Sequence, residues 1–298
     1  MGYRELHASG ELARRCRQLH DLLGECRLCP RRCQARRLEG ERGACGAGRE
    51  VEVASYGPHF GEEFPLVGAG GSGTVFFSWC SLRCVYCQNY SVSRGRERRA
   101  VATEQLAAIM LHLQQRGCAN VNLVTPTHYV PHIVEALGQA CRQGLSLPLV
   151  YNSSGYEEEE TLRLLDGVVD IYLPDLKYSD ARVGLKYSGV ADYPQAARAA
   201  LKEMYRQVGD LALDANGLAV RGVLIRHLVL PGGLAGTGEA MEFIARELSP
   251  TACINLMDQY YPAYHARRYP ELSRRISGEE FAAARECALR ASPRFRLL

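Results

Sequence analysis

Residues 74–87 read TVFFSWCSLRCVYC, a short apolar run followed at once by three cysteines. The run TVFFS (74–78) predicts a buried strand. Cys80, Cys84 and Cys87 then fall in the loop after it, at spacings of four and three. A tetrahedral zinc site or an ordinary iron–sulfur cluster needs four thiolates. The loop therefore either takes a fourth ligand from elsewhere in the chain or belongs to a site with one position left open.

The sequence after this loop alternates between helices and strands. Further strands are predicted at 120–124, 147–152, 168–177, 221–231 and 252–262. Helices are predicted at 103–117, 130–143, from 157 onward, 196–208, 237–249 and 277–291. This alternation predicts an α/β fold with a parallel sheet. Six strand–helix units are fewer than the eight of a closed barrel, so an open partial barrel and a doubly wound sheet both fit.

In either fold the functional groups are expected just beyond the carboxyl ends of the strands. Polar, glycine and cysteine residues do collect there, in the cysteine loop and in TPTHY (125–129), NSSGY (152–156), PDLKYSD (174–180), PGG (231–233) and DQYYP (258–262). The segment HFGEE (59–63) precedes the first parallel strand. It is interpreted either as a polar surface loop or as a substrate-binding segment at the same rim.

The N-terminal segment differs in composition from the rest of the chain. Apolar residues recur at helical spacing over residues 3–24. The segment that follows, ECRLCPRRCQARRLEGERGACGAG, has too little apolar content to fold without a stabilising metal site or cross-link. Cys26, Cys29, Cys33 and Cys45 form a complete set of four thiolates, suited to zinc or to an auxiliary iron–sulfur cluster. Such a site would act either as a structural staple or as an electron relay. We therefore predict a helix plus Cys-rich metal-binding module at 1–48 and a barrel domain at 49–298.

The bulk composition is that of a globular protein. The chain has 298 residues, of which 47% are hydrophobic and 23% charged, and its net charge of +3 is too small to indicate nucleic-acid binding. No apolar run is long enough for a membrane span, and the charged N-terminus does not resemble a signal peptide, so a cytoplasmic location is expected. Twelve cysteines in such a chain favour metal or redox chemistry over disulfides.

The cysteine loop carries a resemblance to a known family. The pattern CxxxCxxC with an aromatic residue, here Tyr86, before the last cysteine is the signature of the radical S-adenosylmethionine superfamily, and the resemblance extends over residues 70–262. The wider pattern GSGTVFFSWCSLRCVYCQN, NLVTPTH, YNSSGY and DLK is most similar to the pyruvate formate-lyase-activating-enzyme-like (PflX-type) subgroup. The resemblance implies a partial (β/α)6 TIM-like barrel, which adds to the α/β expectation.

The resemblance also implies cofactors and site residues. Cys80, Cys84 and Cys87 would bind a 4Fe–4S cluster whose open iron takes S-adenosylmethionine. The cofactor would be contacted by residues after three strands, namely Thr125, Thr127, Asn152, Ser154, Asp175 and Lys177. The chain departs from the family at two places. TPTH stands where many members have GGE, and Tyr260-Tyr261 stands where activases tend to have a histidine near the adenosine, which leaves the adenine contacts unassigned.

The activity implied is reductive cleavage of S-adenosylmethionine, followed by hydrogen-atom abstraction from a substrate. Electrons would come from a donor such as flavodoxin or ferredoxin, and a glycyl radical enzyme is the first substrate hypothesis, which would make the partner a protein. The alternatives are radical modification of another peptide or of a small molecule. A rival of a different class is a non-catalytic iron–sulfur or zinc protein that uses both cysteine groups for binding.

Overall fold

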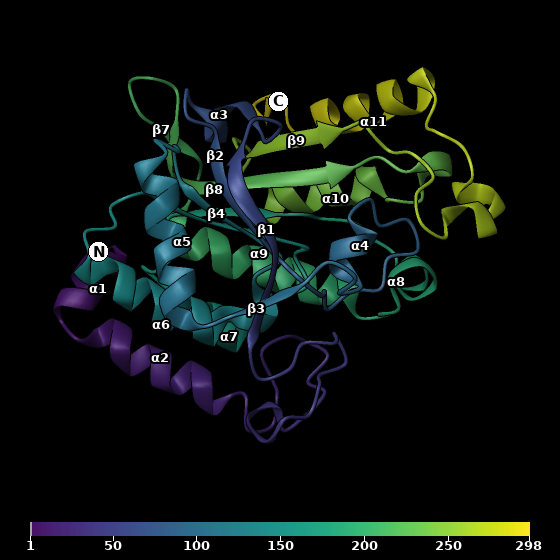
Figure 1. Cartoon of the computed structure of the whole chain (residues 1–298). Helices are drawn as coiled ribbons and strands as arrows, with labels where there is room; N and C mark the ends of the chain where they lie inside the picture. The colour runs from purple at the N-terminus through teal and green to yellow at the C-terminus, as the bar shows by residue number, and fades with distance from the viewer. Residues whose placement is uncertain (1) are drawn as a thin grey trace.

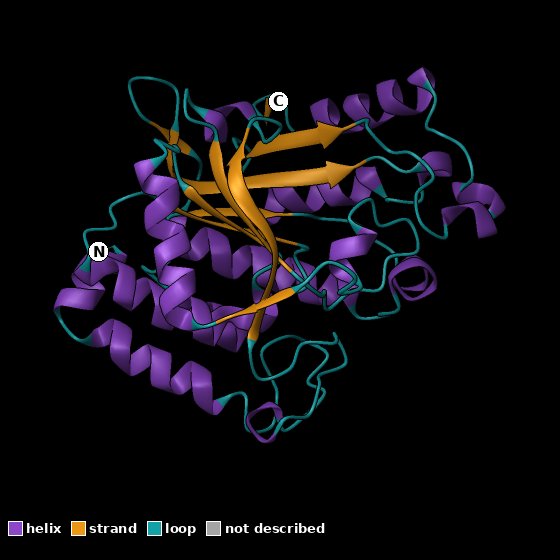
Figure 2. Cartoon of the chain, in the orientation of Figure 1, coloured by secondary structure: helices purple, strands orange, loops and turns teal. Residues whose placement is uncertain are grey.

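A largely parallel sheet runs through the centre of the molecule, and helices cover its outer side (Figures 1 and 2). The computed structural model describes residues 2–298. Within them, six parallel strands lie side by side in chain order: β2 (Ser72–Phe77), β4 (Val121–Val124), β5 (Leu149–Ser153), β6 (Ile171–Pro174), β8 (Ala219–Leu228) and β9 (Cys253–Met257). The sheet stays open, with β3 and β10 at its two ends. This order confirms the partial (β/α)6 barrel.

Short strands extend both edges of the parallel sheet. On one side β1 (Val51–His59) pairs antiparallel with β2, and β3 (Arg99–Val101) pairs antiparallel with β1. On the other side β10 (Arg296–Leu297) pairs with β9, and β7 (Ala212–Leu213) pairs with β8. The strands β3, β7 and β10 were not expected from the sequence, because two or three residues are too few to show an alternating pattern.

The helices between the strands pack on the sheet through apolar faces. In α5, for example, Leu106, Met110 and Leu113 are fully buried. The helices of the barrel are α5 (Thr103–Gln115), α6 (Val130–Arg142), α7 (Glu159–Leu164), α9 (Tyr193–Val208), α10 (Thr237–Phe243) and α11 (Gly278–Ala291). The helix α10 continues into a π-helical turn, η4 (Ile244–Leu248). These helices confirm the predicted ones to within a few residues.

Shorter helical segments occupy the loops. They are α3 (Phe64–Val67), α4 (Tyr90–Ser93), α8 (Ala181–Ser188), η2 (Thr127–Tyr129), η3 (Pro231–Gly233), η5 (Ala266–Arg268) and η6 (Pro270–Leu272). The helix α8, which follows the DLK segment and has Asp180 as its N-cap, was not predicted from the sequence. The loop that contains α3 joins the end of β1 to the start of β2, because His59 pairs with Ser72. It therefore closes the amino end of the barrel, opposite the predicted rim.

The N-terminal segment lies against the outside of the barrel, below α6 in Figure 1. The helical rhythm predicted over 3–24 is divided into α1 (Tyr3–Ala8) and α2 (Glu11–Asp21), because Gly10 adopts a left-handed backbone with φ 78°. The helix α2 packs on α6, and its Leu12 and Leu19 belong to the same buried cluster as the barrel interior. The cysteine-rich segment that follows is drawn mostly as loop in Figure 2, apart from η1 (Arg37–Glu39).

Candidate functional site

A cavity of about 240 Å³ opens at the carboxyl ends of the parallel strands. Every one of the six strands, or the loop directly after it, contributes to its lining. The contributors include Cys80 after β2, Thr125 after β4, Asn152 on β5, Asp175 after β6, Arg226 on β8 and Gln259 after β9. The prediction that chemically reactive and polar side chains collect at this rim is confirmed.

The three cysteines of the loop 80–87 all line this cavity. Ser188 Oγ lies 3.0 Å from Cys84 Sγ, and Ser93 Oγ lies 3.3 Å from Cys87 Sγ. The backbone N–H of Leu82 points to Cys80 Sγ at 3.4 Å. Each sulfur therefore has one polar neighbour. The two serines were missed from the sequence, because Ser188 lies on the unpredicted helix α8 and Ser93 on the short helix α4.

The donor set of this loop fits an iron–sulfur cluster. Within residues 2–298, no three His, Cys, Asp or Glu side chains converge closely enough to hold one metal ion. In an iron–sulfur cluster each thiolate binds a different iron, so its ligands need not converge on one point. Three thiols around one cavity, each with a polar neighbour, therefore form a donor set that fits such a cluster.

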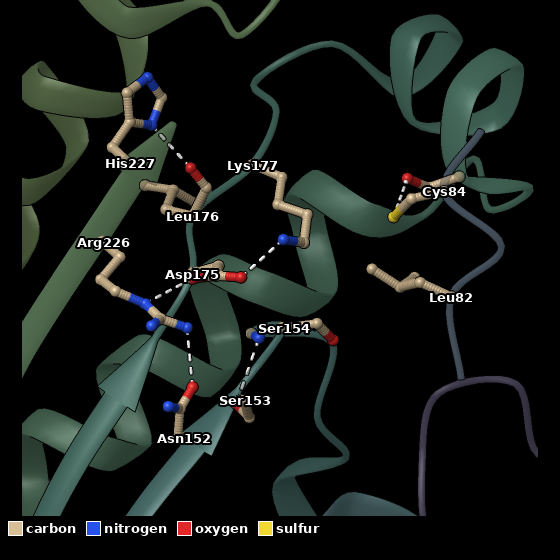
Figure 3. A network of polar contacts seen from close by, with 12 residues as sticks. Leu82, Cys84, Asn152, Ser153, Ser154, Asp175, Leu176, Lys177, Arg226 and His227 are labelled. Carbon is tan, nitrogen blue, oxygen red and sulfur yellow. Dashed lines mark hydrogen bonds and ion pairs between the residues drawn. The ribbon is translucent and has the colours of Figure 1, made fainter. Parts of the chain in front are cut away.

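The wall of the cavity opposite the cysteines is a charged network around Asp175 (Figure 3). Lys177 Nζ lies 2.6 Å from Asp175 Oδ2, and Arg226 Nε donates to Asp175 Oδ1 at 2.9 Å. Arg226 Nη2 also donates to Asn152 Oδ1 at 2.7 Å. Because β6 and β8 are neighbours in the sheet, Asp175 and Arg226 form an isolated bridge between them. The network thus joins the ends of three strands.

The charges in this network hold one another ionised. Burial alone would raise the pKa of Asp175, but Arg226 and Lys177 outweigh it and hold that pKa below its usual range. Burial alone would lower the pKa of Lys177, but Asp175 and the nearby Cys84 raise it above its usual range. Lys177 is therefore a half-buried cation at neutral pH, close to both the cavity and the cysteine loop.

Unusual backbone conformations shape the same rim. Thr125 and Trp79 both have positive φ, 58° and 75°, although neither is glycine. Such conformations cost about 1 kcal/mol or more and are concentrated at functional sites. Gly155 has φ 74°, and a Cβ there would lie 2.2 Å from the carbonyl oxygen of Asp175. The glycine in NSSGY therefore lets this loop pass directly against the DLK segment.

Five of the six residues predicted to contact the cofactor line the cavity: Thr125, Asn152, Ser154, Asp175 and Lys177. The sixth, Thr127, lies outside it. Its side chain is 1% exposed and donates to Glu157 Oε1 at 2.8 Å. Their roles toward a cofactor stay predictions. Arg226 also lines the cavity but was not among the residues predicted to contact the cofactor. A charged residue within the apolar run VLIRHLVL could have indicated its role. Its neighbour His227 points the other way, toward Leu176 and Thr237.

Glu62 and Glu63 enter the barrel from the end opposite the rim. They precede α3 in the closing loop, with side chains 9% and 5% exposed. Their carboxylates lie 3.8 and 3.9 Å from Arg226 Nη1, and Asn255 Nδ2 donates to Glu63 at 3.0 Å. Burial raises the pKa of Glu62 to about 7, against the attraction of Arg226. These residues are therefore neither a polar surface loop nor part of the rim, because β1 runs antiparallel to β2 and carries them to the other end.

The four N-terminal cysteines lie together beside the barrel. A Cβ on Gly43 would lie 3.4 Å from Cys45 Sγ and 3.5 Å from Cys33 Sγ, so both sulfurs lie beside Gly43. Burial raises the pKa of Cys29, and the neighbouring thiols of Cys45 and Cys26 raise it further. All twelve cysteines of the chain are free thiols in the described structure. The segment thus gathers four thiols without forming a disulfide.

Comparisons with known proteins agree with this site. The chain is 33% identical over 280 residues to an uncharacterized protein of Methanocaldococcus jannaschii, across 90% of this chain and 75% of that one. A second uncharacterized protein of the same organism is 25% identical over 177 residues, across 54% of this chain and 51% of its own length.

None of the described helices is long and apolar enough to cross a membrane.

A solved structure and a family model identify the fold. A radical SAM methyltransferase from Sphaerobacter thermophilus superposes with a TM-score of 0.50 and 14% identity, across 76% of this chain and 66% of that one. At this identity the likeness shows the fold alone. The model of the radical SAM superfamily matches residues 74–232, just over half of the chain, and this match includes the three-cysteine loop. The chain therefore belongs to the radical SAM superfamily.

Proposed function

We propose that Cys80, Cys84 and Cys87 hold a 4Fe–4S cluster and that the cavity beside them binds S-adenosylmethionine at the open iron. Membership of the superfamily implies reductive cleavage of this cofactor at such a cluster. The observation that carries the assignment to these residues is the cavity itself, because three thiols and a half-buried charged network face each other across it. When bound, the cluster and cofactor supply a 5′-deoxyadenosyl radical that takes a hydrogen atom from the substrate.

The chain's own residues bind and orient the cofactor. Lys177 supplies a fixed positive charge for the cofactor's carboxylate, and Asp175 holds Lys177 in place through its 2.6 Å ion pair. Asn152, Ser154 and Thr125 supply polar groups along the same rim. Arg226 positions both Asp175 and Asn152 from β8. Because these side chains are held by one another, little reorganisation is needed when the cofactor binds.

The cofactor assignment is tested by anaerobic reconstitution, reduction with dithionite and measurement of 5′-deoxyadenosine. We expect the Cys84→Ala variant to lose at least about a hundredfold in product formation, since a cluster ligand is removed. Cys287→Ala is the matched control, because this partly buried cysteine lies on α11 outside both cysteine groups. Equal product from the wild type and the Cys84→Ala protein would overturn the assignment.

For the substrate we propose a polypeptide that receives a glycyl radical. The support is the resemblance of the DLK segment to activases of glycyl radical enzymes, together with the place of Asp175 and Lys177 on the cavity wall. In this reaction a glycine Cα–H bond breaks, the hydrogen atom passes to the 5′ carbon and the radical stays on the peptide. The test uses a pyruvate formate-lyase-type polypeptide deuterated at glycine Cα. We expect deuterium in the 5′-deoxyadenosine, whereas cofactor cleavage without deuterium transfer would point to another peptide or a small molecule.

We also propose an acidic electron donor of the flavodoxin or ferredoxin type, acting in the cytoplasm. Arg94 and Arg96 lie over the rings of Tyr264 and Tyr90, each at 5.7 Å, and the side chains of Tyr90 and Tyr264 are stacked. Arg268 is exposed. Desolvation lowers the pKa of His265, and the charges of Arg268, Arg94 and Arg96 lower it further, so the three arginines lie near one another. Within residues 2–298 none of the three arginines has a carboxylate partner in an ion pair, so this basic patch beside the cysteine loop is available to an acidic surface.

We further propose that Cys26, Cys29, Cys33 and Cys45 hold a second metal centre. Four thiols complete a coordination sphere, which leaves no position for a substrate.

A further inference from the structure

The side chain of Arg37 is a buried cation with no carboxylate beside it. Its exposed fraction is 0%. Nε and Nη2 donate to the carbonyl of Gly48 at 2.9 and 2.7 Å, and Nη1 donates to the carbonyl of His128 at 2.7 Å. Among the described residues, Arg37 forms no ion pair with Asp or Glu. The guanidinium also lies over the ring of Tyr129, 5.7 Å from its centre. A buried charge without a countercharge is nevertheless costly, so a negative charge close to Arg37 would stabilise it.

A cysteine beside Arg37 can carry that charge. Arg37 Nη1 lies 4.0 Å from Cys26 Sγ. A protonated thiol is neutral and would leave the guanidinium uncompensated. Four thiolates on a metal centre carry net negative charge, whether the centre is zinc or iron–sulfur. The position of Arg37 is therefore explained if the four cysteines are metal-bound.

The geometry of the four thiols favours a cluster over a single ion. The N–H of Cys26 donates to the carbonyl of Ala35, and the N–H of Gln34 donates to the carbonyl of Cys26, so residues 26–35 form a closed loop that contains three of the cysteines. Their side chains nevertheless do not converge on one metal ion, according to the geometry of the described residues. In a polynuclear centre each thiolate binds a different iron, so its ligands need not converge on one point.

The four-cysteine segment also touches the loop of the open site. Gly46 lies flat against the indole of Trp79, since a Cβ on Gly46 would fall 2.2 Å from a ring carbon. Trp79 directly precedes Cys80. Arg83 donates to the carbonyl of Ala44 at 3.0 Å, and Arg31 donates to the carbonyl of Ser81. Three contacts thus join the four-cysteine segment to Trp79 and the loop 80–87.

We propose that Cys26, Cys29, Cys33 and Cys45 hold an iron–sulfur cluster with Arg37 as its buried countercharge, and that this cluster braces the cysteine loop 80–87 through Gly46 and Trp79. The bracing role rests on the proposed function of Cys80, Cys84 and Cys87, whereas the cluster itself does not. The N-terminal segment is then a positioning element for the open site.

The first test separates the two cysteine groups. In a Cys80→Ser/Cys84→Ser/Cys87→Ser triple variant, anaerobic reconstitution should leave about four irons and four sulfides per chain, the content of one 4Fe–4S cluster. Adding Cys29→Ser and Cys33→Ser should remove them. Zinc in place of iron, or no bound metal, would overturn the cluster. This measurement needs no S-adenosylmethionine, so failure of the proposed activity would not affect it.

The second test concerns Arg37. In the triple-variant background, Arg37→Gln should release iron to a chelator at least about tenfold faster, because the countercharge is lost. Arg37→Lys keeps the charge and should restore part of the stability of the cluster. Arg36→Gln is the matched control, since Arg36 is exposed and paired with Glu39 and Glu41. Unchanged release from a folded Arg37→Gln protein would remove Arg37 from the proposal.

The third measurement tests whether the N-terminal cluster is coupled to the loop that follows Trp79. Trp79 is the single tryptophan of the chain, so tryptophan fluorescence reports on the surroundings of this one ring, which include Gly46 and Gly95. In the triple variant, loading iron and sulfide should lower Trp79 emission, and the further Cys29→Ser/Cys33→Ser protein should show no such loss. Emission that stays the same while the N-terminal cluster assembles would show that the two loops are not coupled.

Discussion

The two cysteine groups of this protein differ in number, surroundings and countercharge. The group at 80–87 has three thiols and faces a cavity, and the cation beside it, Lys177, is already paired with Asp175. The group at 26–45 has four thiols, and the cation beside it, Arg37, has carbonyl partners but no carboxylate in the described structure. The charge balance at the first group leaves room for a ligand, whereas the second group itself must supply the missing negative charge. Ligand number and countercharge together therefore distinguish an open site from a closed one.

The contact between the two groups is most directly broken at Gly46. Gly46→Ala should destabilise the protein by about 4 kcal/mol, because it adds a Cβ both to a left-handed residue with φ 103° and against the Trp79 ring. Gly40→Ala is the matched control, since Gly40 has φ 96° but no atom within 4 Å of the added Cβ, and should cost only about 1 kcal/mol. Urea unfolding of both variants measures the difference. Equal costs would show that Gly46 is required only for its backbone conformation.

Glu157 can be used to test which of the two threonines predicted to contact the cofactor, Thr125 or Thr127, belongs to the open site. Thr125 lines the cavity, whereas Thr127 donates to Glu157, which also accepts from Tyr151 at 2.9 Å. Burial raises the pKa of Glu157 from its usual value to about 7. The folded state therefore holds a proton between pH 4.5 and 7 that the unfolded state has lost. This group makes the protein less stable as the pH rises through that window, by about 3 kcal/mol in total.

Glu157→Gln should remove the share of this pH dependence that Glu157 contributes, while the share of Glu62, whose pKa is also raised to about 7, stays. The affinity for S-adenosylmethionine should be unchanged. Urea unfolding between pH 5 and pH 8 measures the first effect, and product formation against cofactor concentration measures the second. Glu160→Gln, at an exposed position of the same acidic run, should retain the pH dependence. A raised KM for the cofactor in Glu157→Gln would show that Thr127 takes part in cofactor binding.

The charge balance of the open site is tested at Lys177. Lys177→Met should lower kcat/KM for cofactor cleavage about a hundredfold, because it removes the cation and leaves Asp175 with Arg226 alone. Lys186→Met is the control, as Lys186 is exposed and paired with Glu271 on the surface. The 5′-deoxyadenosine assay measures both. Wild-type kinetics in Lys177→Met would separate the charged network from cofactor binding.

The sequence predicts the scaffold of the open site but not its internal pairing. Apolar runs place the six parallel strands, and the cysteine spacing together with the residues after each strand identifies the rim. The pairing of Asp175 with Arg226 joins positions 51 residues apart and depends on β6 and β8 being neighbours. The run EEEE predicts only a charged helix start, yet its first residue, Glu157, is buried at 2% exposure. Likewise, nothing local shows that Glu62 and Glu63 reach Arg226 from the opposite end. Tertiary contacts decide these roles, and local patterns do not contain them.

The smallest effect is expected at the basic patch of Arg94, Arg96 and Arg268, where the open site meets the surface. An Arg96→Gln/Arg268→Gln variant should raise the KM for a reduced flavodoxin about fivefold, because exposed charges chiefly affect the rate of encounter between partners. The same variant should weaken the salt dependence of that reaction, since fewer charges are left to be screened. Cleavage driven by dithionite should be unchanged, because that small reductant does not need a docking surface. Arg290→Gln on α11 is the control, as Arg290 is exposed and paired with Glu286. If the variant loses as much activity with dithionite as with flavodoxin, these arginines act on the path of the substrate and not on the electron donor. The closed four-cysteine group would then be the next candidate for the entry point of electrons.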